Sequence, residues 1–413
     1  MAPTPLRRNR DFVLLQSGQL LSAMGSEATS IAYPLLALAL THSPARAGLV
    51  AFARLVPFAV LQLPAGLAAD RFDRRRMMVG ADVVRATTVG VLAASIAMGD
   101  ASFALLAVVA LIEGSATVAF TVAATGALRS VVPARQLPDA VAAVTARMAT
   151  VNLAGPPLGG FLFGVARSLP FVVDACSYAA SLTSLALIRT PFQQVRGPSD
   201  ATIRAQIAEG MRFLWGHPFL RTCAFLYGLG NFALPGILLV IVVAGREQGL
   251  SGGAIGALLA AFGICLLAGS LLSPIARRRL SMRTILWIEL VAWMGSAAFL
   301  VRPSVFVLAA GILPQGIAMP MTDSVVVGYR IAVTPDRLLG RVEAVRSSIA
   351  LSIAPLGPLV AGFLLEKISA RETIAFFCLF NVVLLTWGVL SPAIRRAPSL
   401  SDLATAEGWM IDR

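Results

Sequence analysis

Residues 66–76 read Gly-Leu-Ala-Ala-Asp-Arg-Phe-Asp-Arg-Arg-Arg, a short charged stretch between two apolar blocks. The block before it covers residues 46–69, and the block after it covers residues 77–98. Each block has the roughly 20 residues that a helix needs to cross a hydrocarbon core of about 30 Å. The pattern therefore predicts two membrane-spanning helices joined by a charged loop at one surface.

Apolar blocks of this kind recur along the whole chain. Of its 413 residues, 57% are hydrophobic and only 13% are charged, whereas soluble domains carry about 25% charged residues. We predict twelve spans, at residues 12–40, 46–69, 77–98, 102–128, 139–166, 170–188, 219–243, 253–275, 284–301, 304–328, 340–365 and 372–394. The composition indicates a polytopic helical membrane protein and argues against a soluble enzyme, a disordered chain or a secreted disulfide scaffold.

The distribution of basic residues predicts the orientation of these spans. The chain has 34 Lys and Arg against 21 Asp and Glu, a net charge of +13. With the N-terminus placed in the cytoplasm, 24 basic residues fall in inner segments and 6 in outer ones, as the positive-inside rule requires. The charge is therefore interpreted as a topology signal, and no nucleic-acid partner is expected. We predict a monomer in the cell (inner) membrane with both termini cytoplasmic.

The two halves of the sequence resemble each other. Seven identities share an offset of 202 residues without a gap, and among them Gly155-Pro156 matches Gly357-Pro358 and Gly160 matches Gly362. Related six-helix halves are typical of alternating-access transporters, whose site lies between the halves. The predicted organisation is a cytoplasmic N-terminus at 1–11, an N-terminal bundle at 12–188, a cytoplasmic linker with one amphipathic helix at 189–218, a C-terminal bundle at 219–394 and a cytoplasmic tail at 395–413.

The charged stretch at 66–76 resembles the loop motif of the major facilitator superfamily, Gly-x-Leu-Ala-Asp-Arg followed by a basic cluster. It lies between the second and third predicted spans on the cytoplasmic side, where that family carries its motif. The resemblance covers almost the whole chain and is strongest to twelve-span bacterial exporters of drugs, macrolides and siderophores. It implies an all-α membrane protein with twelve transmembrane helices in two pseudo-symmetric six-helix bundles.

The charged residues of this loop are predicted to form a cytoplasmic gate. Asp70 can pair with an arginine or accept hydrogen bonds from a helix N-terminus, and such contacts must break when the cytoplasmic side opens. The predicted gate residues are Gly66, Asp70, Arg71, Arg74, Arg75, Asp82 and Arg85. Asp82 and Arg85 are three residues apart, so they can pair on one helix face. The alternative is that the arginines only anchor the topology.

A second stretch resembles the Gly-Pro-x-x-Gly-Gly motif that the same superfamily associates with antiporters. Its residues are Gly155, Pro156, Gly159 and Gly160. Glycines let helices approach closely, and a proline bends a helix. The alternative to an antiporter signature is the ordinary packing of small residues in a membrane bundle.

Several ionisable residues fall within the predicted spans, and ten of them are candidates for a role there. They are Glu27, Arg54, Asp82, Arg85, Glu113, Arg147, Asp174, Glu289, Asp323 and Arg346. Each costs about 2.5–3.5 kcal/mol at the centre of a membrane if it is unpaired. They must therefore face partners or a wet cavity. Asp174 and Arg346 lie near span ends, and we expect structural roles for both.

Glu27 and Glu113 lie mid-span and are the first candidates for proton coupling, because a carboxyl group there can bind and release a proton during transport. Similar exporters place an acid directly after a glycine in the first helix, whereas Ser26 intervenes here. The alternative for Glu27 is a buried polar partner. The other candidates for proton coupling or substrate charge are the counter-ions Arg54 and Arg147 and the second-half acids Glu289 and Asp323.

The predicted function is secondary active transport, a proton-coupled antiport that exports amphipathic organic compounds such as an antibiotic, a drug or a siderophore. An importer or a lipid flippase of the same fold is the open alternative. An intramembrane enzyme is a remote one, since His-Glu-x-x-His does not occur in the sequence. The expected partners are the lipid bilayer, protons and a small amphipathic substrate, with no cofactor and no metal site.

Overall fold

The computed structural model describes residues 6–192 and 203–397, apart from the side chains of Asp70, Ala134, Pro138, Asp336 and Arg337 and of residues 203–206. Within these ranges the regular secondary structure is helical, and no strand occurs. The chain forms two compact units. Unit 1 comprises Met1–Gly197, Leu238–Ala260 and Pro358–Ile368, and unit 2 comprises Pro198–Ile237, Ala261–Gly357 and Ser369–Arg413. Parts of the predicted linker and tail, at 193–202 and 398–413, lie outside the described residues.

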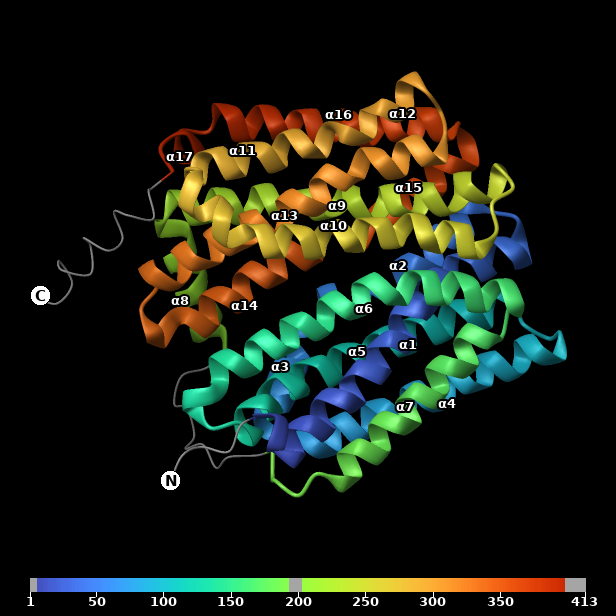
Figure 1. The fold of residues 1–413 in the computed structure, drawn as a ribbon, viewed down its shortest axis with the longest axis horizontal. Helices are drawn as coiled ribbons and strands as arrows, with labels where there is room; N and C mark the ends of the chain where they lie inside the picture. Colours follow the sequence, from blue (N-terminus) through green and yellow to red (C-terminus); the bar gives the residue numbers. More distant parts are fainter. Residues whose placement is uncertain (1–5, 193–202, 398–413) are drawn as a thin grey trace, which may run out of the picture. The chain divides into compact units, whose positions relative to one another are not determined.

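Unit 1 contains the helices of the first half of the sequence (Figure 1). They are α1 (Arg10–Thr41), α2 (Pro44–Val60), α3 (Gln62–Arg71), α4 (Arg74–Met98), α5 (Phe103–Val131), α6 (Leu137–Val165) and α7 (Leu169–Leu187), with the short 3₁₀ turns η1 (Leu6–Arg8) and η2 (Ala134–Gln136). Helix α1 packs against α6 and α7, α4 packs against α5 and α7, and α2 packs against α5. Part of the core lies where Phe12, Met78 and Phe120 meet.

Unit 2 contains most of the remaining helices. They are α8 (Ile203–Gly216), α9 (Pro218–Glu247), α10 (Gly252–Arg279), α11 (Met282–Ala292), η3 (Trp293–Ala297), α12 (Ala298–Val301), α13 (Val305–Val333), α14 (Asp336–Ser352), α15 (Leu356–Lys367), α16 (Ala370–Leu390) and α17 (Pro392–Arg395). The end of α9, the start of α10 and most of α15 belong to unit 1. Within unit 2, α13 packs against α11 and η3, and η3 packs against α16.

Every predicted span coincides with one helix or with two or three consecutive helical segments, which confirms the all-α membrane fold. The predicted number of twelve membrane spans is not fully confirmed among the described residues. Ten helices are long and apolar enough to cross a membrane, or eleven if α2 and α3 form one span bent by 51°. Helix α1 has 32 residues, but it is not one of these because polar residues such as Gln19, Ser22 and Glu27 interrupt its apolar surface.

Prolines explain two breaks that divide predicted spans. Pro64 has no N–H to donate to the carbonyl of Val60, and its ring clashes with that carbonyl in a straight helix, so α2 ends at Val60 and α3 starts at Gln62. Pro355 stands in the break between α14 and α15 for the same reason. A bend at such a place leaves backbone carbonyls free to contact other groups.

Side chains fix the starts of several helices where the sequence turns from polar to apolar. Ser43, Asp73 and Ser369 cap α2, α4 and α16 by accepting a hydrogen bond from a backbone N–H of the first turn. At Ser369 the cap is reciprocal, because the carboxylate of Glu372 bonds back to the N–H of Ser369. These caps place the spans within a few residues of their predicted limits.

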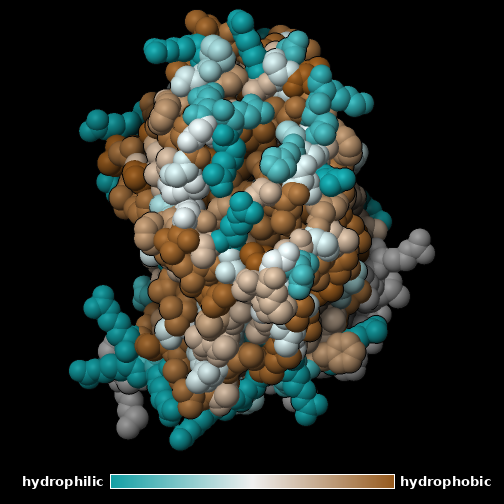
Figure 2. Space-filling model, turned by 90° about the vertical axis from the view of Figure 1, so that its right-hand side faces the viewer, coloured by the Kyte–Doolittle hydropathy of each residue, from teal (hydrophilic) through white to brown (hydrophobic). Residues whose placement is uncertain are grey.

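Large apolar side chains cover much of the surface. Phe161, Leu271, Val301 and Leu379 are all exposed, and the face in Figure 2 is largely hydrophobic, with long hydrophilic side chains mostly toward its two ends. Monomeric soluble proteins rarely expose such large contiguous apolar areas. The surface therefore suits a lipid environment.

Helix α8 is the amphipathic helix predicted inside the linker. Its apolar side buries Leu214 and part of Met211, and the helix packs against α14. Gly210 allows the close approach, because a Cβ there would lie 2.7 Å from the carbonyl oxygen of Arg341. Arg341 also forms an ion pair with Glu209, so α8 is fixed to α14 within unit 2.

Candidate functional site

An ion pair joins α2 to α5 in the interior of unit 1. Nε of Arg54 lies 2.7 Å from Oε2 of Glu113, and Nη2 lies 3.3 Å from Oε1. Nη2 also donates to the carbonyl oxygen of Ser26, at 2.8 Å. The side chain of Glu113 is only 1% exposed and that of Arg54 18%. Arg54, which the sequence offers as a counter-ion, therefore pairs with Glu113.

The hydroxyl group of Tyr178 connects Glu113 with a second acid. Its oxygen lies 3.2 Å from Oε1 of Glu113 and 3.3 Å from Oδ2 of Asp174. Asp174 is completely buried and accepts a further hydrogen bond from Thr29, at 2.9 Å. We call Arg54, Glu113, Asp174 and Tyr178 the acid cluster. A phenol carries one proton, so it can donate to only one of the two acids at a time.

The acid cluster has one acid more than it has bases. Arg54 balances Glu113, whereas the hydrogen-bond partners of Asp174 are hydroxyl groups. A second buried carboxylate without its own cation is costly in a medium of low dielectric constant. The arrangement therefore has a natural place for one exchangeable proton.

A second ion pair lies beside the acid cluster. Asp82 and Arg85 pair across one turn of α4, and both are buried. The guanidinium of Arg85 lies 4.4 Å from the ring centroids of both Tyr178 and Phe120, at which distance a cation is attracted to an aromatic ring. The expected pairing of Asp82 with Arg85 is thus present, and Tyr178 connects it to the acid cluster.

The antiporter-type glycine motif meets α1 at Glu27. A Cβ at Gly155 would lie 2.5 Å from Cγ of Glu27, and a Cβ at Gly159 would overlap the carbonyl oxygen of Ala28. These glycines let α6 lie directly against α1. Glu27 itself is partly buried, and its carboxylate interacts with the hydroxyl group of Ser30 and with the charge of Arg54.

Arg147, the other predicted counter-ion, has amide partners. Its Nη1 donates to the side-chain oxygens of Gln16, at 2.8 Å, and Gln19. Both glutamines precede Glu27 by two turns of α1 or more, so Arg147 is too far along the helix to serve as a counter-ion to Glu27. The structure brings together Arg54 and Glu113, but not Arg147 and an acid.

Two further glycine pairs join segments of unit 1 that are far apart in the sequence. A Cβ at Gly160 in α6 would overlap the carbonyl oxygen of Gly252 at the start of α10, and a Cβ at Gly362 in α15 would lie 2.9 Å from Cα of Gly48 in α2. Glu366 extends the second contact by accepting hydrogen bonds from Ser43, at 2.8 Å, and from the N–H of Ala45, at 3.2 Å. We call these two contacts the glycine pairs.

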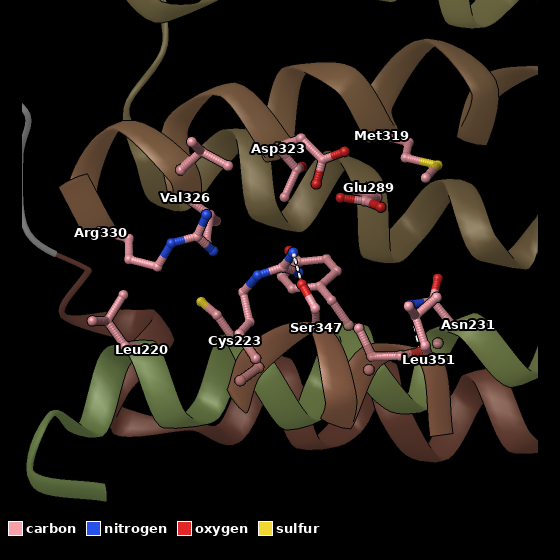
Figure 3. Close-up of a pocket in the computed structure, with 18 of the residues that line it drawn as sticks. Leu220, Cys223, Asn231, Glu289, Met319, Asp323, Val326, Arg330, Ser347 and Leu351 are labelled. Atoms are coloured by element: carbon pink, nitrogen blue, oxygen red, sulfur yellow. Dashed lines mark hydrogen bonds between the residues drawn. The ribbon is translucent and has the colours of Figure 1, made fainter. Parts of the chain in front are cut away.

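A cavity of about 430 Å³ lies within unit 2. Helices α9, α11, α13 and α14 and the turn η3 line it, and Figure 3 shows Glu289 and Asp323 close to each other with Arg330 toward one end. Both Arg330 and Arg346 pair with Glu343, each at 2.6 Å. The two predicted second-half acids, Glu289 and Asp323, therefore share one cavity, together with Arg346.

Comparison with known families shows the family to which this chain belongs. The family model described as Major Facilitator Superfamily matches residues 16–301. The chain belongs to the major facilitator superfamily. It is a multi-pass membrane transporter and not an enzyme.

Curated relatives of this superfamily member include multidrug efflux pumps. It is 28% identical to the multidrug efflux pump Tap of Mycolicibacterium fortuitum, over 95% of this chain and 98% of that protein. It is also 28% identical to the multidrug efflux pump Tap of Mycobacterium tuberculosis (strain ATCC 25618 / H37Rv), over 97% of this chain and 96% of that protein. The similarity thus extends over nearly the full length of both chains.

Solved structures share the fold of this superfamily member. A bacterial homologue of the iron transporter ferroportin in the inward-facing state matches with a TM-score of 0.71 and 16% identity, covering 93% of this chain and 99% of that one. A bacterial homologue of the human lysosomal transporter Spinster, inward-facing and occupied, matches with a TM-score of 0.72 and 15% identity, covering 94% and 97%.

The superfamily loop motif is held to unit 1 by its arginines. Nη2 of Arg75 donates to the carbonyl oxygens of Leu185 and Ala186 at the end of α7, at 2.6 and 3.0 Å. The guanidinium of Arg74 lies against Gly126 in α5, and Arg71 is exposed. A Cβ at Gly66 would meet open space. The side chain of Asp70, the central residue of the predicted gate, lies outside the described residues.

Three residues of these sites are absent from the sequence-based candidates. Tyr178 connects Glu113 with Asp174, Thr29 donates to Asp174, and Glu343 pairs with both arginines of the unit 2 cavity. One signal in the sequence points to Tyr178: it follows Asp174 by four residues, so both lie on one face of α7. The structure places Asp174, for which a structural role is expected, in contact with the hydroxyl groups of Thr29, Ser177 and Tyr178.

Proposed function

We propose that this transporter is a proton-coupled antiporter that exports amphipathic organic compounds across the cell (inner) membrane by alternating access. The observation that carries the proposal is the acid cluster, in which one phenol hydroxyl touches two buried carboxylates and the arginine pairs with Glu113. A proton that enters the cluster neutralises the surplus acid. A proton that leaves restores the charge, so the free energy of the bundle depends on its proton load.

Glu27 is the second member of the proposed coupling machinery. It is partly buried beside Gly155 and lies one residue from Ser26, whose hydroxyl is 2.9 Å from the Tyr178 oxygen. A proton or a cationic substrate that reaches Glu27 is therefore close to the acid cluster. Competition between the two for negative charge would couple proton entry to substrate release.

The direction of transport and the substrate class are supported by the relatives. The similarity to the Tap multidrug efflux pumps covers at least 95% of this chain, which favours export of varied organic compounds over import of one nutrient. We further propose that a set of loop-motif residues and one ion pair form the cytoplasmic gate, namely Gly66, Asp70, Arg71, Arg74, Arg75, Asp82 and Arg85. In this proposal the transporter is a monomer with both termini in the cytoplasm.

The test is a panel of amphipathic antibiotics in an efflux-deficient bacterial host. We expect expression of the chain to raise the inhibitory concentration of at least one compound. Everted membrane vesicles should then accumulate that compound when energised, and a protonophore should stop accumulation. Export that continues unchanged after collapse of the proton gradient, or in the variant Glu27→Gln with Glu113→Gln, contradicts the proposal. Proton-driven movement in the opposite direction would identify an importer.

A further inference from the structure

We propose that Arg147 and Gln16 form a binding site for the carboxylate group of an amphipathic organic acid, at the interface between α1 and α6. The inference rests on the proposed function only for the statement that the bound acid is exported. It names a class of substrate that the acid cluster, with its surplus acid, would not attract.

Arg147 is a cation without a charge partner inside a membrane span. It lies roughly two turns after the start of the candidate span Asp139–Val165, and the residue is partly buried. No acid acts on it among the described residues, and its two hydrogen bonds go to the neutral amide groups of Gln16 and Gln19. An arginine inside a membrane almost always has a partner or faces a water-filled space. The interface of α1 and α6 therefore holds a positive charge that no acid in the described part of the chain balances.

The unused edge of the Arg147 guanidinium has the geometry that holds a carboxylate. Nη1 donates to the two glutamine oxygens, whereas Nε is buried and has no hydrogen-bond partner within the described ranges, and no hydrogen bond of Nη2 occurs there either. Two parallel N–H···O bonds from one edge of this planar group bind a carboxylate strongly. Arg54 holds Glu113 with this edge, through Nε and Nη2. Arg147 thus offers the same two donors that Arg54 uses for its acid.

Gln16 adds another donor beside this edge. Its Nε2 atom is buried and has no hydrogen-bond partner among the residues that the structure describes, while its Oε1 atom accepts from Arg147. The guanidinium fixes this orientation of the amide, because the reverse orientation would set N–H groups against N–H groups. The unsatisfied atoms at the interface are therefore donors. Buried polar groups are nearly always satisfied, so the group that completes this set is an acceptor, and a negatively charged one suits the cation.

Apolar side chains adjoin the charge on both helices. On α1, Leu20 follows Gln16 by four residues, so the two share one face. On α6, Val144 precedes Arg147 by three residues and has the same relation. Both apolar side chains are only partly buried. A cation beside an apolar surface favours an acid with an apolar body over a hydrated inorganic anion.

Pyrenebutyrate and pyrenebutanol provide a matched pair of probes, because they share the apolar body and differ in the carboxylate. Binding is measured by titration calorimetry on the purified full chain in phosphatidylcholine nanodiscs, with protein-free nanodiscs as the baseline. We expect the acid to bind at least about tenfold more tightly than the alcohol, the equivalent of ~1.4 kcal/mol. Acetate should compete with the acid. Displacement of the acid by inorganic phosphate but not by acetate would overturn the assignment to a carboxylate.

The variant Arg147→Gln tests the charge. We expect it to lose about tenfold in affinity for pyrenebutyrate and to keep its affinity for pyrenebutanol. Arg129→Gln is the matched control, because Arg129 is an exposed arginine at the end of α5 that adjoins the start of α1. The control should bind both probes as the unchanged chain does. An equal loss in Arg129→Gln would mean that the general positive charge of this end attracts the acid, and would overturn the inference.

The variant Gln16→Glu covers the case in which Arg147→Gln does not fold. It places a carboxylate of the chain itself beside the guanidinium, where it takes the place of the ligand. We expect binding of pyrenebutyrate to fall by about tenfold or more. The midpoint of thermal unfolding should rise, since a charge without a partner gains one. Undiminished binding of the acid in a folded Gln16→Glu chain would overturn the inference.

Two further outcomes separate the site at Arg147 from the proposed antiport. Preferential binding of the acid at Arg147 without proton-driven export of any compound would contradict the proposed function alone. Proton-driven export by a chain that binds acid and alcohol equally would contradict the assignment of Arg147 alone.

Discussion

The carbonyl oxygen of Gly252 occupies the space that a side chain at Gly160 would need. The contact lies at the start of α10 and near the end of α6, at the surface that the distribution of arginines predicts to be external. Gly48 and Gly362 form the corresponding contact between α2 and α15. Each pair joins the first turns of one span to a glycine near the end of another, so the internal repeat of the sequence is visible in the contacts of unit 1.

Gly160→Ala should weaken this contact. The added methyl group would overlap the backbone of Gly252, and overpacking of this kind costs about 1–3 kcal/mol. We expect a lower midpoint of thermal unfolding in detergent and less transport. Gly164→Ala is the matched control, since it lies one turn further along α6 and a Cβ there meets nothing within 4 Å. Equal midpoints for the two variants would show that the close approach does not matter.

Glu113→Gln should impair both stability and coupling, because it leaves Arg54 buried without its partner. Loss of one partner from a buried pair costs about 3–5 kcal/mol. The double variant Arg54→Gln with Glu113→Gln should recover much of that stability and still fail to couple transport to protons. Thermal unfolding and proton-driven uptake into everted vesicles measure the two effects separately. Ser115→Ala, an exposed position on the same helix, serves as control; coupling retained in the double variant would exclude this pair from the proton pathway.

Tyr178→Phe removes one oxygen and leaves the aromatic ring in place. The ring still faces Arg85, so we expect the unfolding midpoint to change little. Proton-driven transport should fall by about tenfold, or ~1.4 kcal/mol, the size of one lost hydrogen bond. The comparison variant is Tyr329→Phe, whose ring packs against Phe219 in unit 2. Transport at the original rate in Tyr178→Phe would mean that the bridge between the two acids has no part in turnover.

Variants of Asp82 and Arg85 test whether this buried ion pair stabilises the folded protein. Asp82→Asn leaves the guanidinium of Arg85 without its charge partner, and the expected loss is about 3–5 kcal/mol. Asp82→Leu combined with Arg85→Met replaces both charges with apolar groups, which is often neutral or stabilising for a buried pair. We therefore expect the double variant to unfold at a higher temperature than Asp82→Asn. A double variant that is less stable than the single one would point to further contacts of Arg85, such as those with the rings of Phe120 and Tyr178.

The sequence predicts the helices well because a membrane leaves little choice of structure. Spans must be about 20 apolar residues long and must satisfy their own backbone hydrogen bonds, so apolar blocks bounded by Ser43, Asp73 or Ser369 become helices close to the expected limits. The breaks at Pro64 and Pro355 are also explained by local chemistry. Helix α1 is an exception, because its composition alone does not identify it as a membrane span. Its polar residues are accommodated by packing against α6 and α7.

The partners of the intramembrane charges depend on which helices lie together, and only part of this is local. Asp82 with Arg85 could be predicted because three residues separate them on one helix. Arg54 with Glu113 could be named as one option among several, because the sequence does not say which faces of α2 and α5 meet. The bridge from Glu113 to Asp174 through Tyr178, and the placing of Glu289 and Asp323 in one cavity, require three or more helices and follow from the tertiary fold alone.

The position of Tyr178 gives the first bundle a mechanical property that neither ion pair has alone. One end of this rigid side chain touches the two acids, and its face holds the guanidinium of Arg85 on α4. A displacement of α4 would therefore disturb the environment of both carboxylates, and protonation of either acid would alter the surroundings of the Arg85 guanidinium. Such linkage is reciprocal by thermodynamic necessity. The side chain of Tyr178 alone can thus couple the position of α4 to the charge of the two acids, and the charge of the acids to the position of α4.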